Sequence, residues 1–366
     1  PVLVSRAHIA NGVARAVLVQ SGNANAATGE RGMRDAERMA ALVAAELGCA
    51  VSEVLVASTG VIGVPLPMER VEAGIADAAA SLDATAGQLA AEAITTTDAA
   101  PKLAERTATT AIGPIRVGGM AKGAGMIRPD LGTMIAVVTT DAPLDAEQCD
   151  RILRAAVDAT FNCITVDGCT STSDTVVLLA SGAVAGTLDA TGEQLVADAV
   201  LAVCEDLALQ IVRDGEGAQR IARWQVTGAD DDDAARRIAY GVAEAQLVRC
   251  ALNGGDPNWG RIADALGNAQ VTDAAILEAA GMPAAEAAAR AGTRVDLDPD
   301  RVRIAIAGTE VFAGLPLPFD KGAVSASMAA EEILVRVSVG DGLGSGEAFG
   351  CDLSEEYVIE NSEYST

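Results

Sequence analysis

Thr133 is the residue whose type and neighbours most clearly permit covalent chemistry. It follows the glycine-rich stretch 118–132 and precedes the apolar run 134–138, which predicts a short buried strand. Glycines tolerate backbone conformations that other residues resist, so a hydroxyl at this point can be presented to a reaction partner. The same stretch also fits a glycine-rich turn that only leads into a core strand. By itself it does not decide between the two interpretations.

A conventional catalytic base is hard to find in this chain. It has one histidine, His8, so a Ser-His-Asp or Cys-His triad would depend on that residue. His8 has no other catalytic-looking group near it in sequence and is predicted to be a solvated surface residue. The motifs H-E-x-x-H, G-x-S-x-G and C-x-x-C are absent, which excludes zincin, α/β-hydrolase and thioredoxin interpretations. A threonine that becomes an N-terminus can instead use its own α-amino group, whose pKa is about 7.7–8.0.

Composition excludes several classes of protein. The net charge of −25 argues against nucleic acid and against an anionic membrane surface as partners. With 366 residues, 50% of them hydrophobic, the chain is long enough for two domains or one large one. No apolar run reaches the length of a membrane span, and no signal peptide is visible. The seven cysteines lack metal-ligand spacing, which indicates reduced thiols in a cytoplasmic protein and no metal site.

The elements that must position Thr133 alternate between strand and helix patterns, which predicts an α/β protein with mixed layers. The predicted strands are 14–20, 54–57, a pair within 107–117 turned at Gly113-Pro114, 134–138, 175–180, 302–312 and 335–339. The predicted helices are 31–47, 68–82, 145–161, 193–213, 234–252 and 274–291. The stretch 340–350 is predicted to be a glycine-rich connection.

Other candidate groups have ordinary explanations when each is taken alone. Residues 123–128 fail the dinucleotide-binding pattern at its last position, and no P-loop motif occurs in the chain. Lys122 alone fits a solvated side chain, Glu216 a loop acid, and Thr59-Gly60 a turn that ends a strand.

Seven motifs together change this interpretation. They are S-G-N-A-N-A-A-T-G (21–29), S-T-G-V-I-G-V-P-L-P-M (58–68), T-T-D-A-A-P-K (96–102), K-G-A-G-M-I-R-P-D-L-G-T-M (122–134), V-D-G-C-T-S-T-S-D-T (166–175), G-G-D-P-N-W-G-R (254–261) and E-N-S-E-Y-S-T (360–366). In this order the chain resembles the ornithine acetyltransferases, also called arginine-biosynthesis bifunctional glutamate N-acetyltransferases. Members of that family usually carry a further stretch, mostly strands, ahead of the point where this sequence starts.

The resemblance implies a self-processing fold with an N-terminal threonine nucleophile. The precursor would cut itself between Gly132 and Thr133, giving an α chain 1–132 and a β chain 133–366 that stay associated, as an α2β2 heterotetramer. Thr133 would be the nucleophile, with its α-amine as base, and Thr59 and Gly60 would form the oxyanion hole. The residues implied to bind substrate, besides Thr133, are Thr96, Lys122, Glu216, Asn361 and Thr366.

The resemblance also implies a reaction. Thr133 would take the acetyl group of N2-acetylornithine, release ornithine, and pass the acetyl group to glutamate in arginine biosynthesis, with ping-pong kinetics. Some members of the family also use acetyl-CoA, and the sequence does not decide this point. No metal or bound cofactor is implied.

Two alternatives remain open at this stage. One is a related N-terminal-nucleophile amidase or aminopeptidase, in which water replaces glutamate as the acceptor. The other is a non-catalytic remnant, suggested by the absent N-terminal stretch. Intact Thr133, Thr59 and Gly60 count against the second alternative, because a relic has no need to keep the whole set.

Overall fold

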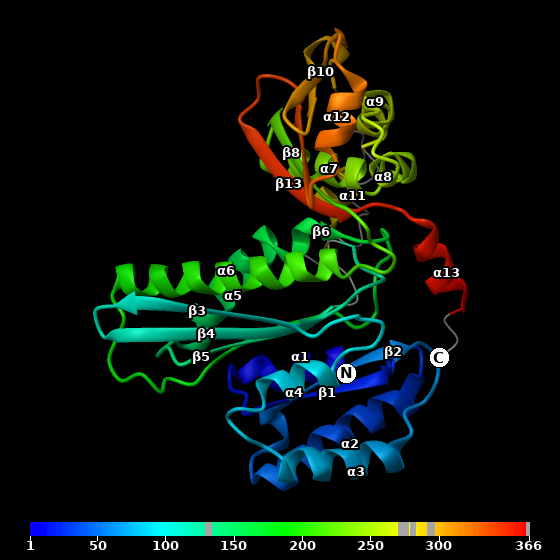
Figure 1. The fold of residues 1–366 in the computed structure, drawn as a ribbon. Coiled ribbons are helices and arrows are strands. Elements are labelled where there is room, and N and C mark those ends of the chain that lie inside the picture. Colours follow the sequence, from blue (N-terminus) through cyan, green and yellow to red (C-terminus); the bar gives the residue numbers. More distant parts are fainter. Residues whose placement is uncertain (129–133, 270–277, 279–282, 291–296, 364–366) are drawn as a thin grey trace. The chain divides into compact units, whose positions relative to one another are not determined.

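The computed structural model describes residues 1–128, 134–269, 278, 283–290 and 297–363 (Figure 1). These residues form two compact units. The first unit consists of Pro1–Asn162 and Cys169–Asp214, and the second of Cys163–Gly168 and Gly215–Glu363. Each unit combines sheet with helices, so the expected mixed α/β architecture is confirmed. The expected chains 1–132 and 133–366 concern cleavage rather than folding units, and they stay a prediction.

One sheet of the first unit is a parallel pair of strands, β1 (Ala16–Asn23) and β2 (Val54–Val61). The helix between them, α2 (Gly29–Leu47), buries an apolar face that includes Met39. It ends at Gly48, whose φ of 65° is a left-handed conformation that glycine adopts without a Cβ clash. Because the two strands are parallel, their carboxyl ends lie side by side.

The second sheet of this unit has the strand order β3-β4-β5-β7. Its strands are β3 (Lys102–Thr110), β4 (Gly113–Lys122), β5 (Ile135–Thr140) and β7 (Thr175–Ala180). Helices α5 (Ala146–Ala159) and α6 (Ala190–Arg213) cover one face of the sheet (Figure 1). Gly119 of β4 allows α6 to pack closely, since a Cβ there would come within 2.9 Å of the Val203 side chain. The strand register places Lys122 opposite Ile135, and Ile135 opposite Thr175.

The second unit contains one mixed sheet with the strand order β11-β10-β9-β12-β8-β13-β6. Its strands are β6 (Ile164–Thr165), β8 (Ile221–Ala229), β9 (Arg303–Ile306), β10 (Thr309–Ala313), β11 (Leu315–Pro316), β12 (Glu332–Ser338) and β13 (Gly344–Cys351). Helix α7 (Asp232–Ala243) packs on β8 and β13, and the core between them includes Trp224 and Ile238.

The two units contain further helices among the described residues. The α-helices are α1 (Val2–His8), α3 (Met68–Ala80), α4 (Gly87–Ala93), α8 (Gln246–Asn253), α9 (Trp259–Asn268), α11 (Ala284–Arg290), α12 (Lys321–Ser327) and α13 (Glu355–Glu363). The 3-10 helices are η1 (Ile9–Asn11), η2 (Val51–Glu53), η3 (Phe161–Cys163) and η4 (Pro299–Arg301).

The prediction of a glycine-rich connection at 340–350 is wrong, because most of this stretch is strand β13. The glycines serve close packing rather than a loop. A Cβ at Gly346 would lie 2.5 Å from the backbone nitrogen of Arg236 in α7. Helix α7 can therefore approach β13 only because that position has no side chain.

Three further predictions of elements are wrong in detail. The helix predicted at 234–252 is two helices, α7 and α8, separated by a short break at Glu244 and Ala245. The strand predicted at 302–312 is the hairpin β9–β10, which turns at Ala307 and Gly308, where both φ values are positive. The hairpin β3–β4 turns before Gly113-Pro114, not at it, because Pro114 stands second in β4. Strand β8 was not predicted from the sequence.

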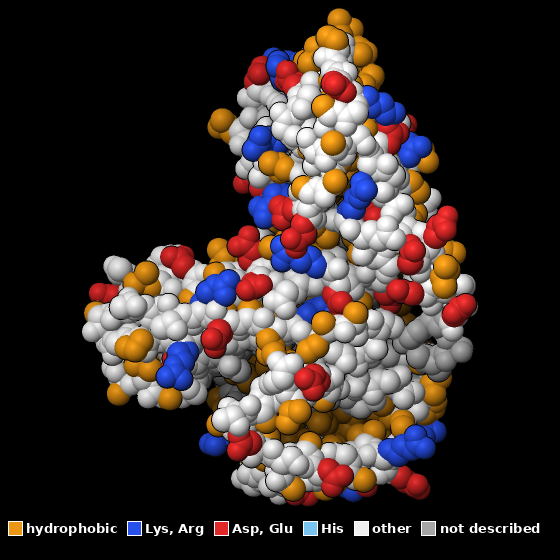
Figure 2. Space-filling model, in the orientation of Figure 1, with side chains coloured by type: hydrophobic (Ala, Val, Ile, Leu, Met, Phe, Trp, Pro, Cys, Tyr) orange, Lys and Arg blue, Asp and Glu red, His pale blue; other side chains and the backbone are white. Residues whose placement is uncertain are grey.

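The helix predicted at 274–291 falls mostly outside the described residues, which cover it only at 278 and as α11. In the described part of the chain, no helix is long and apolar enough to cross a membrane. On the face drawn in Figure 2, Lys and Arg side chains are scattered among Asp and Glu side chains rather than gathered into one basic surface.

Candidate active site

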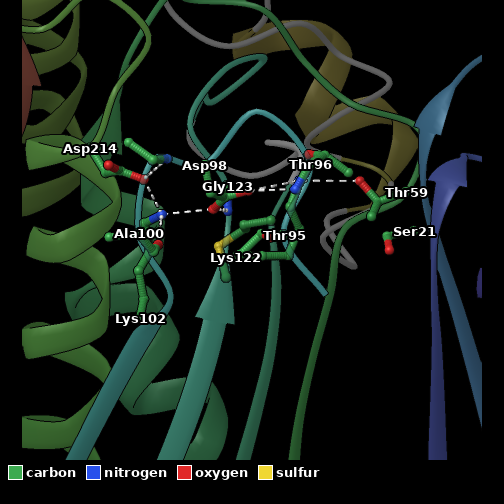
Figure 3. A network of polar contacts seen from close by, with 12 residues as sticks. Ser21, Thr59, Thr95, Thr96, Asp98, Ala100, Lys102, Lys122, Gly123 and Asp214 are labelled. Atoms are coloured by element: carbon green, nitrogen blue, oxygen red, sulfur yellow. Dashed lines mark hydrogen bonds and ion pairs between the residues drawn. The ribbon is translucent and has the colours of Figure 1, made fainter. Parts of the chain in front are cut away.

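A polar cluster in the first unit brings together residues from both of its sheets (Figure 3). Lys122 is the last residue of β4, Thr59 lies near the end of β2, and Thr96 and Asp98 lie in the loop before β3. Lys122 stands opposite Ile135, the first residue of β5, so the cluster lies beside the start of that strand. The predicted nucleophile Thr133 precedes this strand in sequence. Both Thr133 and Gly132 lie outside the described residues.

Lys122 is the centre of the cluster, and its side chain is 3% exposed. Its Nζ donates to Thr96 Oγ1 at 2.7 Å and to Thr59 Oγ1 at 3.2 Å. It also lies 3.7 Å from Asp98 Oδ2. The expectation from the residue type alone, a solvated lysine, is therefore wrong, and the structure brings together three of the predicted site residues, Lys122, Thr59 and Thr96.

Asp98 is the buried counter-charge, with a side chain that is 0% exposed. Its Oδ1 accepts from the Gly123 N–H at 2.6 Å and from Lys102 Nζ at 2.6 Å. Its Oδ2 accepts from the Thr96 N–H at 3.1 Å. Burial acts to raise the pKa of Asp98, but the charges of Lys122 and Lys102 and the donated hydrogen bonds outweigh it, so the pKa lies below its ordinary value. Asp98 is thus an anion at neutral pH.

Lys102 and Asp214 extend this network away from the hydroxyls. Lys102 is 1% exposed, and its Nζ lies 2.5 Å from Asp214 Oδ2. Asp214 follows the last residue of α6, where a negative charge opposes the helix dipole. The buried ammonium of Lys102 compensates for this unfavourable position.

Gly60 has a backbone that no other residue could adopt at this place. Its φ is 121°, and an added Cβ would lie 2.3 Å from the carbonyl carbon and oxygen of Gly22 in β1. Thr59 and Gly60 pair in parallel register with Ser21 and Gly22. The two strand ends therefore pack backbone against backbone, which fixes the direction of the Gly60 peptide.

Asp174 contacts the backbone of Met134, the residue just before β5. Its Oδ1 accepts from the Met134 N–H at 3.1 Å, and the Thr175 N–H donates to the Met134 carbonyl at 3.1 Å. Burial raises the pKa of Asp174 to about 8, against the opposing effects of the Met134 N–H and the charge of Lys122. Because the Met134 nitrogen is bonded to the carbonyl carbon of Thr133, Asp174 anchors the peptide next to the predicted nucleophile.

The remaining predicted substrate-binding residues are Glu216, Asn361 and Thr366. Glu216 and Asn361 lie in the second unit, where Asn361 Nδ2 donates to Glu216 Oε2 at 2.9 Å. Thr366 lies outside the described residues. Glu216 and Asn361 are therefore hydrogen-bonded to each other, and their role in substrate binding stays a prediction.

His8 is not the solvated surface residue that was predicted. It is partly buried, and its Nδ1 donates to the Val54 carbonyl at 2.7 Å, since a carbonyl oxygen can only accept. Among the described residues, no group of three or more His, Cys, Asp or Glu side chains is arranged to hold a metal ion.

Four residues of this region were not predicted as functional: Asp98, Lys102, Asp174 and Asp214. Asp98 and Lys102 belong to the motif T-T-D-A-A-P-K, in which only Thr96 had been given a role. Their four-residue spacing could have suggested an ion pair. An acid directly after a long helix, as at Asp214, is a further signal, because it conflicts with the helix dipole.

Comparison with solved structures places this fold among known enzymes. The crystal structure of the arginine biosynthesis bifunctional protein ArgJ from Bacillus halodurans is similar at 35% identity with a TM-score of 0.54, covering 62% of this chain and 98% of that one. The ornithine acetyltransferase of Mycobacterium tuberculosis, solved in complex with ornithine, is 38% identical over 35% of this chain and 69% of that one, with a TM-score of 0.30. The comparison of folds therefore rests on the Bacillus protein.

Sequence comparison covers the whole chain. The model of the ArgJ family matches residues 1–366. The arginine biosynthesis bifunctional protein ArgJ of Thermus thermophilus is 44% identical over 355 residues, which are 96% of this chain and 83% of that protein. The chain belongs to the ArgJ family. The predicted family, fold and enzyme class, an acyltransferase of arginine biosynthesis, are thereby confirmed.

Proposed function

We propose that the protein transfers an acetyl group from N2-acetylornithine to glutamate, with the hydroxyl of Thr133 as the carrier. The observation that supports this most is the buried ammonium of Lys122, which hydrogen-bonds the hydroxyls of Thr59 and Thr96 beside the strand that follows Thr133. A positive charge and hydroxyl donors beside a nucleophile suit an amino-acid substrate that carries a carboxylate and an amide carbonyl.

Self-cleavage is the first step of the proposal. The Thr133 hydroxyl attacks the carbonyl carbon of Gly132, and the bond from that carbon to the Thr133 nitrogen breaks as the nitrogen takes up a proton. Water then opens the resulting ester. The products are a carboxylate on Gly132 and a Thr133 that carries both a free hydroxyl and a free α-amine, so the chain makes its own catalytic base.

Acetyl transfer follows in two half-reactions. The α-amine takes the Thr133 hydroxyl proton while the oxygen attacks the acetyl carbonyl of N2-acetylornithine. The carbon–nitrogen bond then breaks as its nitrogen takes that proton from the α-ammonium, which releases ornithine. The amine of glutamate then attacks the acetyl ester, giving N-acetylglutamate and free Thr133. Each half-reaction passes through an oxyanion, which we assign to the Thr59 hydroxyl and the Gly60 N–H. Such donors are worth about 2.7–4 kcal/mol each in the transition state.

The charged ends of the substrate have candidate partners among the residues that the family resemblance implies. We assign a substrate carboxylate to Lys122 and Thr96, and a substrate amine to Glu216, whose carboxylate is oriented by Asn361. Thr366 completes the set by resemblance. We extend the proposal to an α2β2 assembly of the cleaved chains, and to a cytoplasmic enzyme, since all seven cysteines are free thiols.

The test is an assay of the purified protein with N2-acetylornithine in the presence and absence of glutamate. Acetyl transfer predicts fast release of ornithine only when glutamate is present, together with N-acetylglutamate. Equal release of ornithine and free acetate without glutamate would replace the proposal with an amidase. A third reaction, with acetyl-CoA and glutamate alone, distinguishes a bifunctional enzyme from a monofunctional one.

The assignment of Glu216 has its own test. Glu216→Ala removes the charge proposed to bind the substrate amine, so the KM for N2-acetylornithine should rise about tenfold or more while self-cleavage is unchanged. The matched control is Glu355→Ala, which removes an exposed acid at the start of α13 and should leave KM within about twofold. An unchanged KM in Glu216→Ala would remove this residue from the site.

A further inference from the structure

The donors and acceptors around Lys122 fix the direction of two hydroxyl groups. A lysine ammonium carries only donors. The contacts from Nζ to Thr96 Oγ1 at 2.7 Å and to Thr59 Oγ1 at 3.2 Å therefore make both hydroxyl oxygens acceptors. The single hydrogen of each hydroxyl is then directed to some other acceptor.

The direction of the hydroxyl hydrogen matters most at Thr59, which is 1% exposed. A threonine hydroxyl can rotate, and a rotating hydroxyl presents either its hydrogen or its lone pairs to a nearby carbonyl oxygen. An oxyanion is stabilised only by the hydrogen. With an ammonium against its oxygen, Thr59 is prevented from turning its hydrogen toward Lys122, so the donor orientation exists before the oxyanion forms.

Asp98 holds the ammonium in that position. Its Oδ2 lies 3.7 Å from Lys122 Nζ, and the carboxylate cannot turn away, because it also accepts from the Gly123 N–H, the Thr96 N–H and Lys102. The side chain of Asp98 is fully buried. Two buried ammonium groups thus share one rigidly held carboxylate.

We propose that Asp98 is a positioning residue for acetyl transfer, which holds the Lys122 ammonium against the oxygen of Thr59 and so keeps the Thr59 hydroxyl as a donor to the oxyanion. This inference rests on the proposed function, because it assumes that Thr59 contributes to the oxyanion hole. It gives Lys122 a second role beside substrate binding, and it gives Asp98 a role in turnover rather than only in stability.

A double-mutant cycle between Asp98 and Thr59 tests the proposal. Asp98→Asn keeps one oxygen, which can still accept from the Gly123 N–H, but it turns an amide NH2 toward the Thr96 N–H and removes the charge that holds Lys122. In the enzyme with Thr59, Asp98→Asn should lower kcat at saturating N2-acetylornithine about tenfold. This loss is smaller than the about 10²–10³-fold loss in kcat expected when an oxyanion donor is removed. In the Thr59→Ala background the same change should alter kcat by no more than about twofold, because residues that act as a unit are not additive.

Two controls accompany the cycle. Asp206→Asn makes the same chemical change at a half-buried carboxylate of α6 that pairs with Arg106, and it should leave kcat unchanged. Thr59→Ser keeps the hydroxyl, so Asp98→Asn should again lower kcat in that background. Each rate is divided by the amount of β chain found by intact mass, so that incomplete cleavage does not count as slow turnover. Thermal unfolding shows that each variant is folded at the assay temperature.

The outcomes separate this inference from the proposed function. If Thr59→Ala alone keeps normal turnover, the oxyanion assignment in the proposed function is wrong. If Thr59→Ala is slow but Asp98→Asn lowers kcat equally with and without Thr59, only the present inference is overturned. An Asp98→Asn protein that stays uncut while Thr59→Ala cleaves overturns it too. If Asp98→Asn does not fold, Lys122→Met takes its place in the same cycle. Lys122→Met should then lower kcat in the enzyme with Thr59 and change it little in the Thr59→Ala background.

Discussion

The Thr59 hydroxyl and the Gly60 N–H are the two groups by which the end of β2 is proposed to stabilise the transition state. This end of the strand is rigid because of contacts made by each of the two residues. Gly60 lies against the backbone of Gly22, and the Thr59 oxygen accepts from a lysine that is itself paired with Asp98. Donors that are already oriented need no reorganisation when the oxyanion forms, and this is the main source of their catalytic effect.

Thr59→Ala should therefore lower kcat far more than it raises KM. The oxyanion exists only near the transition state, so the expected loss in kcat is about 10²–10³-fold, while the KM for N2-acetylornithine stays within about threefold. Steady-state kinetics of the cleaved enzyme measure both constants. Thr59→Ser retains the hydroxyl and should recover most of the activity. Normal kcat with a raised KM would move Thr59 from the oxyanion hole to substrate binding.

Asp174 gives a prediction about pH. Its pKa of about 8 in the folded protein lies above the ordinary value of 3.8, so the folded state keeps a proton that the unfolded chain loses between these limits. The contribution of Asp174 to the free energy of unfolding therefore falls as pH rises from about 4 to about 8, and stays low above that.

Asp174→Asn removes this titration while keeping an oxygen that can accept from the Met134 N–H. Between pH 5 and pH 8, the free energy of unfolding should decline less in the variant than in the unmodified protein. Urea denaturation at each pH gives the two curves. Parallel curves would show that Asp174 is ionised in the folded protein across this range.

At the scale of elements, close backbone contacts decide where glycine is needed. Helix α7 packs closely on strand β13 at Gly346, where an added Cβ would come within 2.5 Å of the Arg236 backbone. Gly74 in α3 makes a matched control, because a Cβ there would have no neighbour within 4 Å. The same substitution should thus have opposite effects at the two positions.

Gly346→Ala should lower the free energy of unfolding by about 1–3 kcal/mol through overpacking. Gly74→Ala should raise it by about 0.5–1 kcal/mol, because alanine loses less backbone entropy in a helix. Chemical denaturation measures both values. Equal effects would mean that α7 can move away from β13 without loss.

These contacts also explain what the sequence could and could not predict. Helix α2 and strand β7 were predicted because their apolar spacing and flanking glycines are local signals. Strand β13 was taken for a loop because its glycines are required by α7, a partner more than 100 positions away that local patterns do not reveal. Strand β8 was missed altogether, although its burial alternates between buried and partly buried residues over much of its length.

The candidate site was predicted in the same uneven way. Lys122, Thr59 and Thr96 were named through motif resemblance, and the structure brings them together. Asp98, Lys102 and Asp214 were not, because their importance lies in compensating one another's buried charge. That compensation joins the loop before β3 to the end of α6, which is 112 residues further along the chain from Lys102. Spacing within one motif cannot show it.

At the scale of the whole molecule, the chain crosses between its compact units more than once. Residues 163–168 belong to the second unit although both flanking stretches belong to the first, and the chain enters the second unit again at Gly215. The predicted cut at Gly132–Thr133 lies inside the sequence of the first unit. The β chain would therefore contribute β5 and β7 to a sheet whose other two strands, β3 and β4, come from the α chain.

This topology predicts that the two chains remain together after cleavage. Nine residue pairs join β3 to β4 within the α chain, but β4 also pairs with β5 over Val117–Thr140 to Lys122–Ile135, which would become a pairing between separate chains. Buried residues on both strands, such as Ile115 and Val138, would be exposed to water if the chains parted. Native size-exclusion chromatography should show one species containing both chains, and denaturing gels should show two.

The cut itself is the last prediction, since the proposed activity follows from it. Thr133 supplies a hydroxyl, and the α-amine that would act as its base does not exist until the peptide bond to Gly132 is broken. The structure anchors the peptide on the far side of Thr133, through the hydrogen bonds of Met134 to Asp174 and Thr175. We therefore expect fragments 1–132 and 133–366, with Thr133 as the N-terminal residue of the second.

Intact mass and N-terminal sequencing of the purified protein measure this outcome. Thr133→Ala should leave one uncut and inactive chain, because no hydroxyl remains to attack Gly132. Thr133→Ser keeps a hydroxyl and should cleave, more slowly. Thr139→Ala removes an exposed hydroxyl of β5 and should cleave normally. A fully active protein that remains a single chain would contradict this mechanism.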